Sequence, residues 1–381
     1  MVKFLFWVSV ASLLYTYIGY PVAIWFLARL RRPPVLKSAI TPRVSVVVPC
    51  HNEANTIVSR IENLLESQYP EEQLEIIVVS DGSSDRTIEA VRRCASSRVR
   101  LLAYAERRGK AAAINIGVSS ASGEVVVFAD ARQTFARDAI RQLVSSFADS
   151  KVGAVSGAYL LSNSASAVAQ GVGFYWKYEE WIRRNEARFD SIIGATGAIY
   201  AIRRDLWKPL PVSTILDDVY TPMQIALRGL RVVFEEKALA YDAAANSTSR
   251  EFSRKARTLT GNYQLCQAIP KLLLPSHRLW IQFISHKLLR LVAPFFLLSL
   301  LASNFVLASD LLLYRLTLAA QIAFYASVIA GGSLRKRNCR LRLLNVAYVF
   351  SVMNAAALVG LVYFLRGKRN VWLVNGRKAE G

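Results

Sequence analysis

Cysteine and acidic residues are scarce in this sequence. Four cysteines occur in 381 residues, and their spacing matches neither a disulfide framework nor a metal site, which suits a reducing compartment: Cys50, Cys94, Cys266 and Cys339. Acidic residues number 27 against 48 lysines and arginines, which gives a formal net charge of +21. Such an excess spread over a soluble domain would indicate a nucleic-acid partner, so its distribution decides the question.

Most of the excess positive charge flanks apolar segments. Residues 1–41 hold five basic and no acidic residues, residues 276–381 hold 14 against two, and residues 42–275 hold 29 against 25. A nucleic-acid partner therefore loses its support. Basic clusters beside apolar segments are typical of cytoplasmic membrane anchors, and two of them occur at Arg29–Arg32 and Arg335–Arg337.

Long apolar segments predict an integral membrane protein with four spans: Phe4–Ala28, Leu291–Ser309, Leu311–Ala330 and Leu343–Leu365. The first segment is uncharged, too long for the core of a signal peptide and without a clear small-residue cleavage site, so we expect a retained anchor. The third contains Arg315 and has the weakest signal of the four. The segment Leu279–Leu291 has the pattern of an amphipathic helix lying on the membrane.

The positive-inside rule places the middle of the chain in the cytoplasm and the N-terminus outside. Three spans after the middle domain would put the basic tail Arg366–Lys378 outside, against the same rule. Either one of these segments is re-entrant or interfacial, or the rule fails at the tail. The predicted organisation is an anchor and linker (1–41), a cytoplasmic middle domain (42–275), and a region with an interfacial helix, about three spans and a basic tail (276–381).

The middle of the chain alternates short apolar runs with segments of helical period. Runs at 44–49, 75–80, 101–104 and 125–129 predict strands, and segments at 54–67, 85–95 and 110–121 predict helices. This alternation indicates an α/β fold with a mainly parallel sheet. Glu53, Asp81 and Asp130 follow or end three of the strands. Because such sheets bind ligands beyond the carboxyl ends of their strands, we expect these acids at one site, although Asp130 could instead cap the next helix.

Further features around this sheet have both structural and functional explanations. Asp85 is expected to cap a helix. The segment Arg107–Lys110 offers cationic side chains and free backbone N–H groups to a diphosphate at the start of a helix. Aromatic residues in the helical segment Ala165–Arg188 are expected to pack against membrane-proximal helices rather than to stack on sugars. Asp217 and Asp218 start another helix, where acids also favour the helix dipole.

The motifs taken together resemble the family 2 glycosyltransferases, whose catalytic domain is a nucleotide-sugar-binding fold of the type called GT-A. The terminal spans are similar to those of the membrane-embedded branch that contains the cellulose, hyaluronan and chitin synthases. The resemblance covers nearly the whole chain and is carried by V-S-V-V-V-P-C-H-N-E, V-V-S-D-G-S-S-D, R-R-G-K-A-A-A-I-N-I-G, F-A-D-A-R, G-A-T-G-A-I-Y-A-I-R-R, I-L-D-D-V-Y and the arginine cluster Arg250–Arg257.

This resemblance implies roles for individual residues. The donor, a UDP-sugar, would be bound by Pro49, Glu53, Asp81, Lys110, Asp130, Arg254 and Arg257. Asp130 would also be the first acid of a D-x-D metal motif for Mg²⁺ or Mn²⁺, although Arg132 stands where the second acid is expected and could itself neutralise the leaving group. Asp218 would be the general base, with Gly197 and Asp217 in the acceptor region.

The function implied by the resemblance is that of an inverting membrane glycosyltransferase acting in exopolysaccharide or cell-envelope glycan synthesis. Its acceptor would be a growing glycan or a lipid-linked acceptor, and its surroundings the lipids of a bacterial inner membrane and other polysaccharide synthase subunits. Thr258 replaces the tryptophan of the family's Q-x-x-R-W motif, which argues against synthesis of long polymers. The altered positions Arg132 and Thr258 motivate the alternative, a non-catalytic glycan-binding or scaffold subunit.

Overall fold

The computed structural model describes residues 1–30, 34–161, 167–242, 248–336 and 342–367, and these fall into two compact units. The sheet unit contains Arg31–Ser162 and Glu186–Ala243. The helical unit contains Met1–Leu30, Asn163–Asn185 and Ala244–Lys368. The sequence predicts residues 167–185 and 248–275 within the catalytic domain, whereas the structure groups them with the apolar helices.

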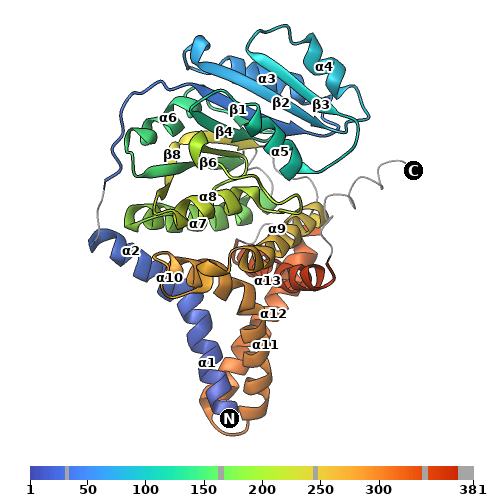
Figure 1. Cartoon of the computed structure of the whole chain (residues 1–381). Coiled ribbons are helices and arrows are strands. Elements are labelled where there is room, and N and C mark those ends of the chain that lie inside the picture. The colour runs from blue at the N-terminus through green and yellow to red at the C-terminus, as the bar shows by residue number, and fades with distance from the viewer. Residues whose placement is uncertain (31–33, 162–166, 243–247, 337–341, 368–381) are drawn as a thin grey trace. The chain divides into compact units, whose positions relative to one another are not determined.

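An eight-stranded sheet forms the centre of the sheet unit (Figure 1). Its strand order is β3-β2-β1-β4-β7-β6-β8-β5. The pairs β1–β2, β1–β4, β2–β3 and β6–β8 are parallel, and the other three pairs are antiparallel. The predicted α/β fold with a mainly parallel sheet is therefore confirmed. The strands are β1 Val44–Cys50, β2 Leu74–Asp81, β3 Val99–Tyr104, β4 Val125–Ala129, β5 Thr134–Phe135, β6 Val152–Leu161, β7 Ile199–Arg203 and β8 Arg231–Asp242.

Helices cover both faces of the parallel strands, which explains why these strands are apolar at successive positions. Val46 and Val48 of β1 belong to the core that also contains residues of α3 and α6. Val47 points to the opposite face and meets α5, where a Cβ atom on Gly117 would lie 2.5 Å from Val47 Cγ1. The helices of the sheet unit are α3 Ile57–Leu65, α4 Thr87–Arg93, α5 Lys110–Ser119, α6 Ala139–Ser145 and α8 Asp217–Leu227.

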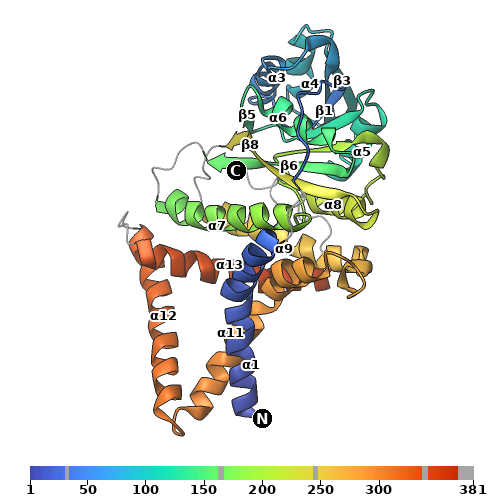
Figure 2. The ribbon, with the colours of Figure 1, turned by 90° about the vertical axis from the view of Figure 1, so that its left-hand side faces the viewer.

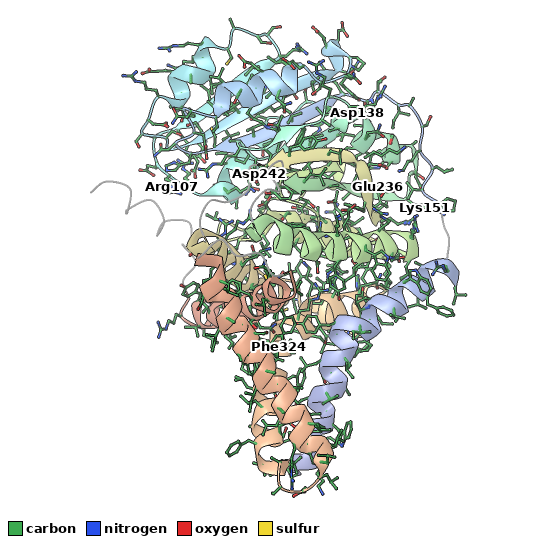
Figure 3. All side chains as sticks on the ribbon, turned by 180° about the vertical axis from the view of Figure 1, so that it is seen from behind. Arg107, Asp138, Lys151, Glu236, Asp242 and Phe324 are labelled. Atoms are coloured by element: carbon green, nitrogen blue, oxygen red, sulfur yellow. The ribbon has the colours of Figure 1, made fainter. Side chains whose placement is uncertain are left out.

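Among the described residues, the helical unit holds four helices that are long and apolar enough to cross a membrane, as predicted: Val2–Leu30, Trp280–Leu307, Leu312–Leu334 and Leu344–Leu365. Figure 3 shows that the side chains around Phe324 in this unit are almost entirely carbon. The elements of the unit are α1 Val2–Leu14, α2 Tyr20–Leu30, α7 Ala167–Phe189, α9 Thr248–Ala268, α10 Trp280–Gln282, α11 Leu289–Leu307, α12 Leu312–Lys336 and α13 Arg342–Leu365, of which α7 continues into the sheet unit after Asn185.

The long apolar helices do not all run in the same direction. Helices α1, α11 and α12 run roughly along one another, whereas α13 runs across α12 and lies beside α9 (Figure 2). Helix α13 approaches α9 closely at Gly360, where a Cβ atom would lie 3.0 Å from the Thr260 backbone nitrogen. The Thr260 hydroxyl also donates to the Gly360 carbonyl oxygen at 3.2 Å.

The segment Leu279–Leu291, expected as a helix on the membrane surface, is not a separate helix. A π-helical stretch, Phe283–Leu288, joins α10 to α11, so that Trp280–Leu307 is one helix. His286 is only 4% exposed and contacts Glu179 of α7 at 3.0 Å. The polar residues that suggested a water-facing surface therefore meet a buried acid instead. The structure does not describe all of the side chains in the predicted basic anchors. Wholly or partly outside the described side chains are Arg32, the cluster Arg335–Arg337 and the end of the basic tail.

Candidate active site

The carboxyl ends of β1, β2 and β4 lie at one edge of the sheet because these strands are adjacent and parallel. Asp81 ends β2, Asp130 follows β4 directly, and Glu53 comes shortly after β1. Pro49 lies within β1, opposite Val79 of β2. The structure thus brings to one edge the backbone positions of the acids that the sequence singles out.

Asp81 fixes the loop that precedes α5. Its Oδ1 atom accepts a hydrogen bond from the Arg108 amide at 2.7 Å, and its Oδ2 atom accepts one from the Gly109 amide at 2.9 Å. The sequence predicts free N–H groups at this helix start, but these two amides are not free because the carboxylate at the end of β2 reaches them first. The contact is tight, since a Cβ atom on Gly82 would lie 2.6 Å from the Arg107 backbone nitrogen.

Lys110, the first residue of α5, is the centre of a cluster of acids. Its Nζ atom lies 2.9 Å from Asp130 Oδ1 and 3.3 Å from Asp217 Oδ1. Asp217 also accepts a hydrogen bond from the Tyr200 hydroxyl at 3.3 Å. The side chain of Asp130 is 37% exposed and that of Asp217 only 8%, so the cluster opens on the Asp130 side.

The acids decide the charge state of this lysine. Burial alone would lower the pKa of Lys110, but Asp130, Asp217 and Asp218 together raise it above its ordinary value. Burial also raises the pKa of Tyr200, and Asp217 and Asp218 raise it further. Lys110 is therefore a permanent cation at neutral pH, and Tyr200 is a neutral hydrogen-bond donor.

Asp218, the expected base, follows Asp217 in the first turn of α8 and lies against the loop at Gly197. A Cβ atom on Gly197 would come within 2.9 Å of Asp218 Oδ2. Only glycine at this position therefore leaves room for the carboxylate in its observed position. The Asp218 carbonyl oxygen accepts a hydrogen bond from the Ala195 amide at 2.7 Å. The loop before β7 and the start of α8 thus hold each other in position.

Arg132 contacts Glu53 rather than Asp130. Its Nε atom lies 2.7 Å from Glu53 Oε1, and the Thr56 hydroxyl donates to Glu53 Oε2 at 2.8 Å. Within the described ranges, the structure contains no group of three or more His, Cys, Asp or Glu side chains placed to hold a metal ion. A metal at this edge would therefore have Asp130 as its protein ligand, together with oxygens of the bound substrate, which is a donor set that Mg²⁺ accepts.

Arg254 and Arg257 belong to α9 in the helical unit, so the structure does not group them with the acids of the sheet unit. Thr258 donates its hydroxyl to the Arg254 carbonyl oxygen at 3.0 Å, a contact within the helix. The side chain of Arg250 lies outside the described residues. Of the aromatic residues of α7 that were expected to pack against membrane-proximal helices, Tyr178 donates its hydroxyl to the Tyr17 carbonyl oxygen at 2.8 Å, whereas Trp181 is 36% exposed.

Tyr200 is the residue of this site that sequence reasoning missed. Its ring stacks on Phe128 with centroids 4.3 Å apart, and its hydroxyl reaches Asp217. The signal that could have revealed it is a phenolic hydroxyl within the otherwise aliphatic strand I-Y-A-I, since a buried hydroxyl needs a partner. Asp85, expected as a helix cap, lies one residue before the N-cap Arg86, and its Oδ1 atom accepts the amide of Thr87 at the start of α4 at 3.0 Å.

Comparison with known sequences gives three matches of interest. Residues 45–209 match the profile of the family described as Glycosyl transferase family 2. The poly-beta-1,6-N-acetyl-D-glucosamine synthase of Staphylococcus aureus (strain MSSA476) is 25% identical over 228 residues. The probable glycosyltransferase YdaM of Bacillus subtilis (strain 168) is 26% identical over 238 residues. Each alignment covers 58% of this chain and 55% of the relative, so the chain spans about half the length of these curated relatives.

A solved structure matches over almost the full length. The mannosyltransferase PcManGT from Pyrobaculum calidifontis, in complex with GDP-Man and Mn²⁺, has a TM-score of 0.74 and is 26% identical in sequence. The match covers 96% of this chain and 99% of that chain. The similarity therefore extends over the residues of the sheet unit and those of the helical unit.

Proposed function

We propose that the protein transfers a sugar from a nucleotide-sugar donor to a glycan or lipid-linked acceptor, because residues 45–209 match the Glycosyl transferase family 2 profile and a solved mannosyltransferase is similar over almost the full length. The observation that carries this proposal is the cluster in which Lys110 pairs with Asp130 and Asp217 beside Asp218. A fixed cation can offset the charge of a departing diphosphate, and a neighbouring carboxylate can take the proton of the attacking hydroxyl.

In the proposed reaction, the acceptor hydroxyl attacks the anomeric carbon while Asp218 takes its proton. The bond from that carbon to the diphosphate oxygen breaks, and the nucleoside diphosphate leaves with the electron pair. A single displacement of this kind inverts the configuration of the sugar. Asp217 is buried between Lys110 and Tyr200, so we assign it the task of positioning Lys110.

We propose that Asp130 holds a Mg²⁺ or Mn²⁺ ion together with the donor phosphates. Its carboxylate is more exposed than that of Asp217, and the similar mannosyltransferase was solved with Mn²⁺. When bound, such an ion would stabilise the charge that develops on the diphosphate. Lys110 contributes to the same task from the protein side, and Glu53 and Asp81 would hold the nucleoside at the neighbouring strand ends.

Two donors have specific support. The motifs of the chain resemble those of enzymes that use UDP-sugars, whereas the similar solved mannosyltransferase binds GDP-Man. We propose a UDP-sugar as the first candidate and GDP-mannose as the second. We further propose that the sheet unit lies in the cytoplasm at a bacterial inner membrane, because the basic cluster Arg29–Arg32 stands in the sequence at the end of the first apolar segment and before β1. Other polysaccharide synthase subunits would be its partners.

The test is nucleoside diphosphate release by the purified full-length protein in lipid nanodiscs, with panels of UDP-sugars and GDP-mannose, with Mn²⁺ or with a chelator. We expect turnover with one donor, and Asp218→Asn should lower kcat by about 10²- to 10⁴-fold. The control is Asp205→Asn, an exposed acid of the sheet unit, which should leave kcat unchanged. Equal turnover in Asp218→Asn would refute the assigned base. No turnover with any donor would favour the scaffold subunit.

A further inference from the structure

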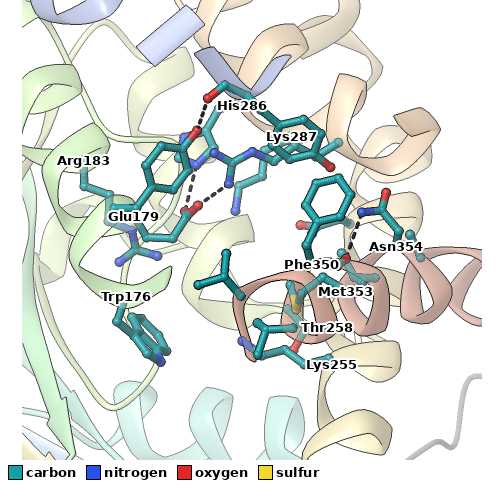
Figure 4. A pocket seen from close by; sticks show the side chains of 18 residues that line it. Trp176, Glu179, Arg183, Lys255, Thr258, His286, Lys287, Phe350, Met353 and Asn354 are labelled. Atoms are coloured by element: carbon teal, nitrogen blue, oxygen red, sulfur yellow. Dashed lines mark hydrogen bonds and ion pairs between the residues drawn. The ribbon is translucent and has the colours of Figure 1, made fainter. Parts of the chain in front are cut away.

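A cavity of about 360 Å³ lies within the helical unit, and its lining includes none of the residues assigned to the reaction. Its lining consists of Tyr17 and of residues from α7, α9, the helix Trp280–Leu307 and α13. Figure 4 shows residues of α7, among them Trp176 and Arg183, on the opposite side from Phe350 and Met353 of α13. Its volume is within the range of sites for small ligands.

One wall of the cavity is apolar and comes from a single face of α13. The residues of this wall recur at helical spacing and carry no hydrogen-bonding side-chain group: Val346, Val349, Phe350, Met353 and Ala357. The Phe350 ring meets the Tyr17 ring with centroids 4.9 Å apart. Such a wall suits a hydrocarbon chain, and a methionine adapts to its shape.

The remaining lining is strongly cationic. Arg183, Lys255, Lys287 and Arg290 face the cavity together with a single acid, Glu179. That acid is neutralised within the protein, because its Oε2 atom lies 3.0 Å from His286 Nε2 and its Oε1 atom pairs with Arg290. The lining therefore carries a net positive charge, which favours an anionic ligand.

Two buried asparagines provide an independent sign of a polar ligand. Asn262 and Asn354 line the cavity, and each is 7% exposed. In the part of the chain that the structure describes, the Oδ1 atom of each is buried without a hydrogen-bond partner. Buried polar atoms are nearly always paired, so a bound group is expected to satisfy them. A side-chain amide can accept from a hydroxyl or, turned over, donate to a phosphate oxygen.

We propose that this cavity binds a lipid that bears a phosphate group. The phosphate would lie at the cationic lining, and the first part of the lipid's hydrocarbon chain would lie along α13. A glycan strand fits less well, since its many hydroxyl groups would find no partners on the apolar wall. The proposal does not depend on the proposed transferase activity.

The test measures the binding of farnesyl monophosphate to the full-length protein by native mass spectrometry, in detergent and without any nucleotide sugar. We expect one bound molecule, and much weaker binding of farnesol, which lacks the phosphate. Lys255→Gln and Lys287→Gln should each weaken binding by about tenfold, since each removes one charged partner. Met353→Trp should block binding by filling the cavity. The matched control is Lys271→Gln, an exposed lysine of the same unit outside the cavity.

Competition distinguishes the two sources of such a lipid. If farnesyl monophosphate stays bound in the presence of an equal concentration of phosphatidylglycerol, the ligand is a prenyl phosphate. If phosphatidylglycerol displaces it, the ligand is a bulk membrane phospholipid. In both cases the lysine variants weaken binding. The proposal is overturned if farnesol binds as well as its phosphate, or if the lysine variants behave like Lys271→Gln. Because the assay contains no sugar donor, that result would leave the transferase proposal intact.

Discussion

Both units contain a cluster of opposite charges, but the two clusters differ in exposure. In the sheet unit, Lys110 pairs with Asp130, whose side chain is 37% exposed, and with Asp217. In the helical unit, Glu179 pairs with His286 and Arg290, and none of these three side chains is more than 14% exposed. The first cluster can therefore exchange a protein partner for a ligand, whereas the second is closed by its own contacts. Exposure rather than charge separates a group available for chemistry from one that joins helices.

The largest expected effect is on the exposed cluster. Lys110→Met should lower kcat for nucleoside diphosphate release by about 10²- to 10³-fold, because it removes the cation that offsets the leaving diphosphate. The measurement is a steady-state assay with saturating donor. Lys151→Met, which changes an exposed lysine of the same unit, should keep the kcat of the wild type. Full activity of Lys110→Met would remove the distinction between the two clusters.

The closed cluster should respond in stability. Glu179→Gln leaves the buried Arg290 and His286 without their carboxylate and should destabilise the fold by roughly 3–5 kcal/mol. The measurement is the Tm of the protein in detergent. Glu180→Gln is the matched control on the same helix, since its partner Arg184 forms a more exposed pair, for which a loss of at most about 1 kcal/mol is expected. Equal Tm values for the two variants would contradict the structural role of Glu179.

The pH dependence of the Tm sharpens the same comparison. Burial alone would raise the pKa of Glu179, but Arg290 and His286 hold it well below its ordinary value of 4.5. Because the pKa is depressed in the folded state, the contribution of this carboxylate is complete above the ordinary value and is lost as the pH falls below it. The Tm of the wild type should therefore fall more steeply below about pH 5 than that of Glu179→Gln.

A smaller effect on activity is expected at Gly197. The added Cβ atom of Gly197→Ala would lie 2.9 Å from Asp218 Oδ2 and push the carboxylate from its place. A displacement of this size should lower kcat by roughly 10- to 100-fold. Gly332→Ala in α12, whose Cβ would meet only the Tyr348 ring at 3.2 Å, should leave kcat unchanged. A Gly197→Ala enzyme with normal kcat would show that Asp218 need not lie there.

The smallest effect is expected at Arg132. Its side chain is 69% exposed and pairs with Glu53, and an exposed ion pair contributes at most about 1 kcal/mol. Arg132→Ala should therefore change kcat/KM by less than about fivefold. A loss greater than a hundredfold would instead mean that Arg132 neutralises the leaving group directly. The same kinetic assay, run with and without Mn²⁺, separates the two outcomes.

Much of the sheet unit follows from the sequence, because parallel strands with buried runs must present their carboxyl ends at one edge. Asp81 and Asp130 are located by this rule. The contact of Lys110 with Asp217 is not, since it joins residues from distant parts of the chain and depends on the antiparallel strand β7 beside β4. Which of the two adjacent acids is buried also depends on Tyr200, whose position no local pattern reveals.

The helical unit is harder to predict for a physical reason. An amphipathic pattern looks the same in the sequence whether its polar face meets water or a buried acid. His286 and Arg290 therefore indicated a surface helix, whereas both contact Glu179 of α7. Likewise, α7 and α9 are polar enough to belong to a soluble domain. Their packing with apolar helices involves contacts such as those of Tyr178 with Tyr17 and of Thr260 with Gly360, which composition does not reveal.

The direction of α13 has a consequence for the path of the chain. This helix has the length and hydropathy of a span, yet it runs across α12 (Figure 2). We expect it to follow the membrane surface, so that a cysteine at Arg366 is labelled from the cytoplasmic face. Three crossings then remain, and because three is odd, the two ends of the chain lie on opposite faces of the bilayer. We therefore expect the basic residues that follow α13 in the sequence on the cytoplasmic face, where the charge rule requires them.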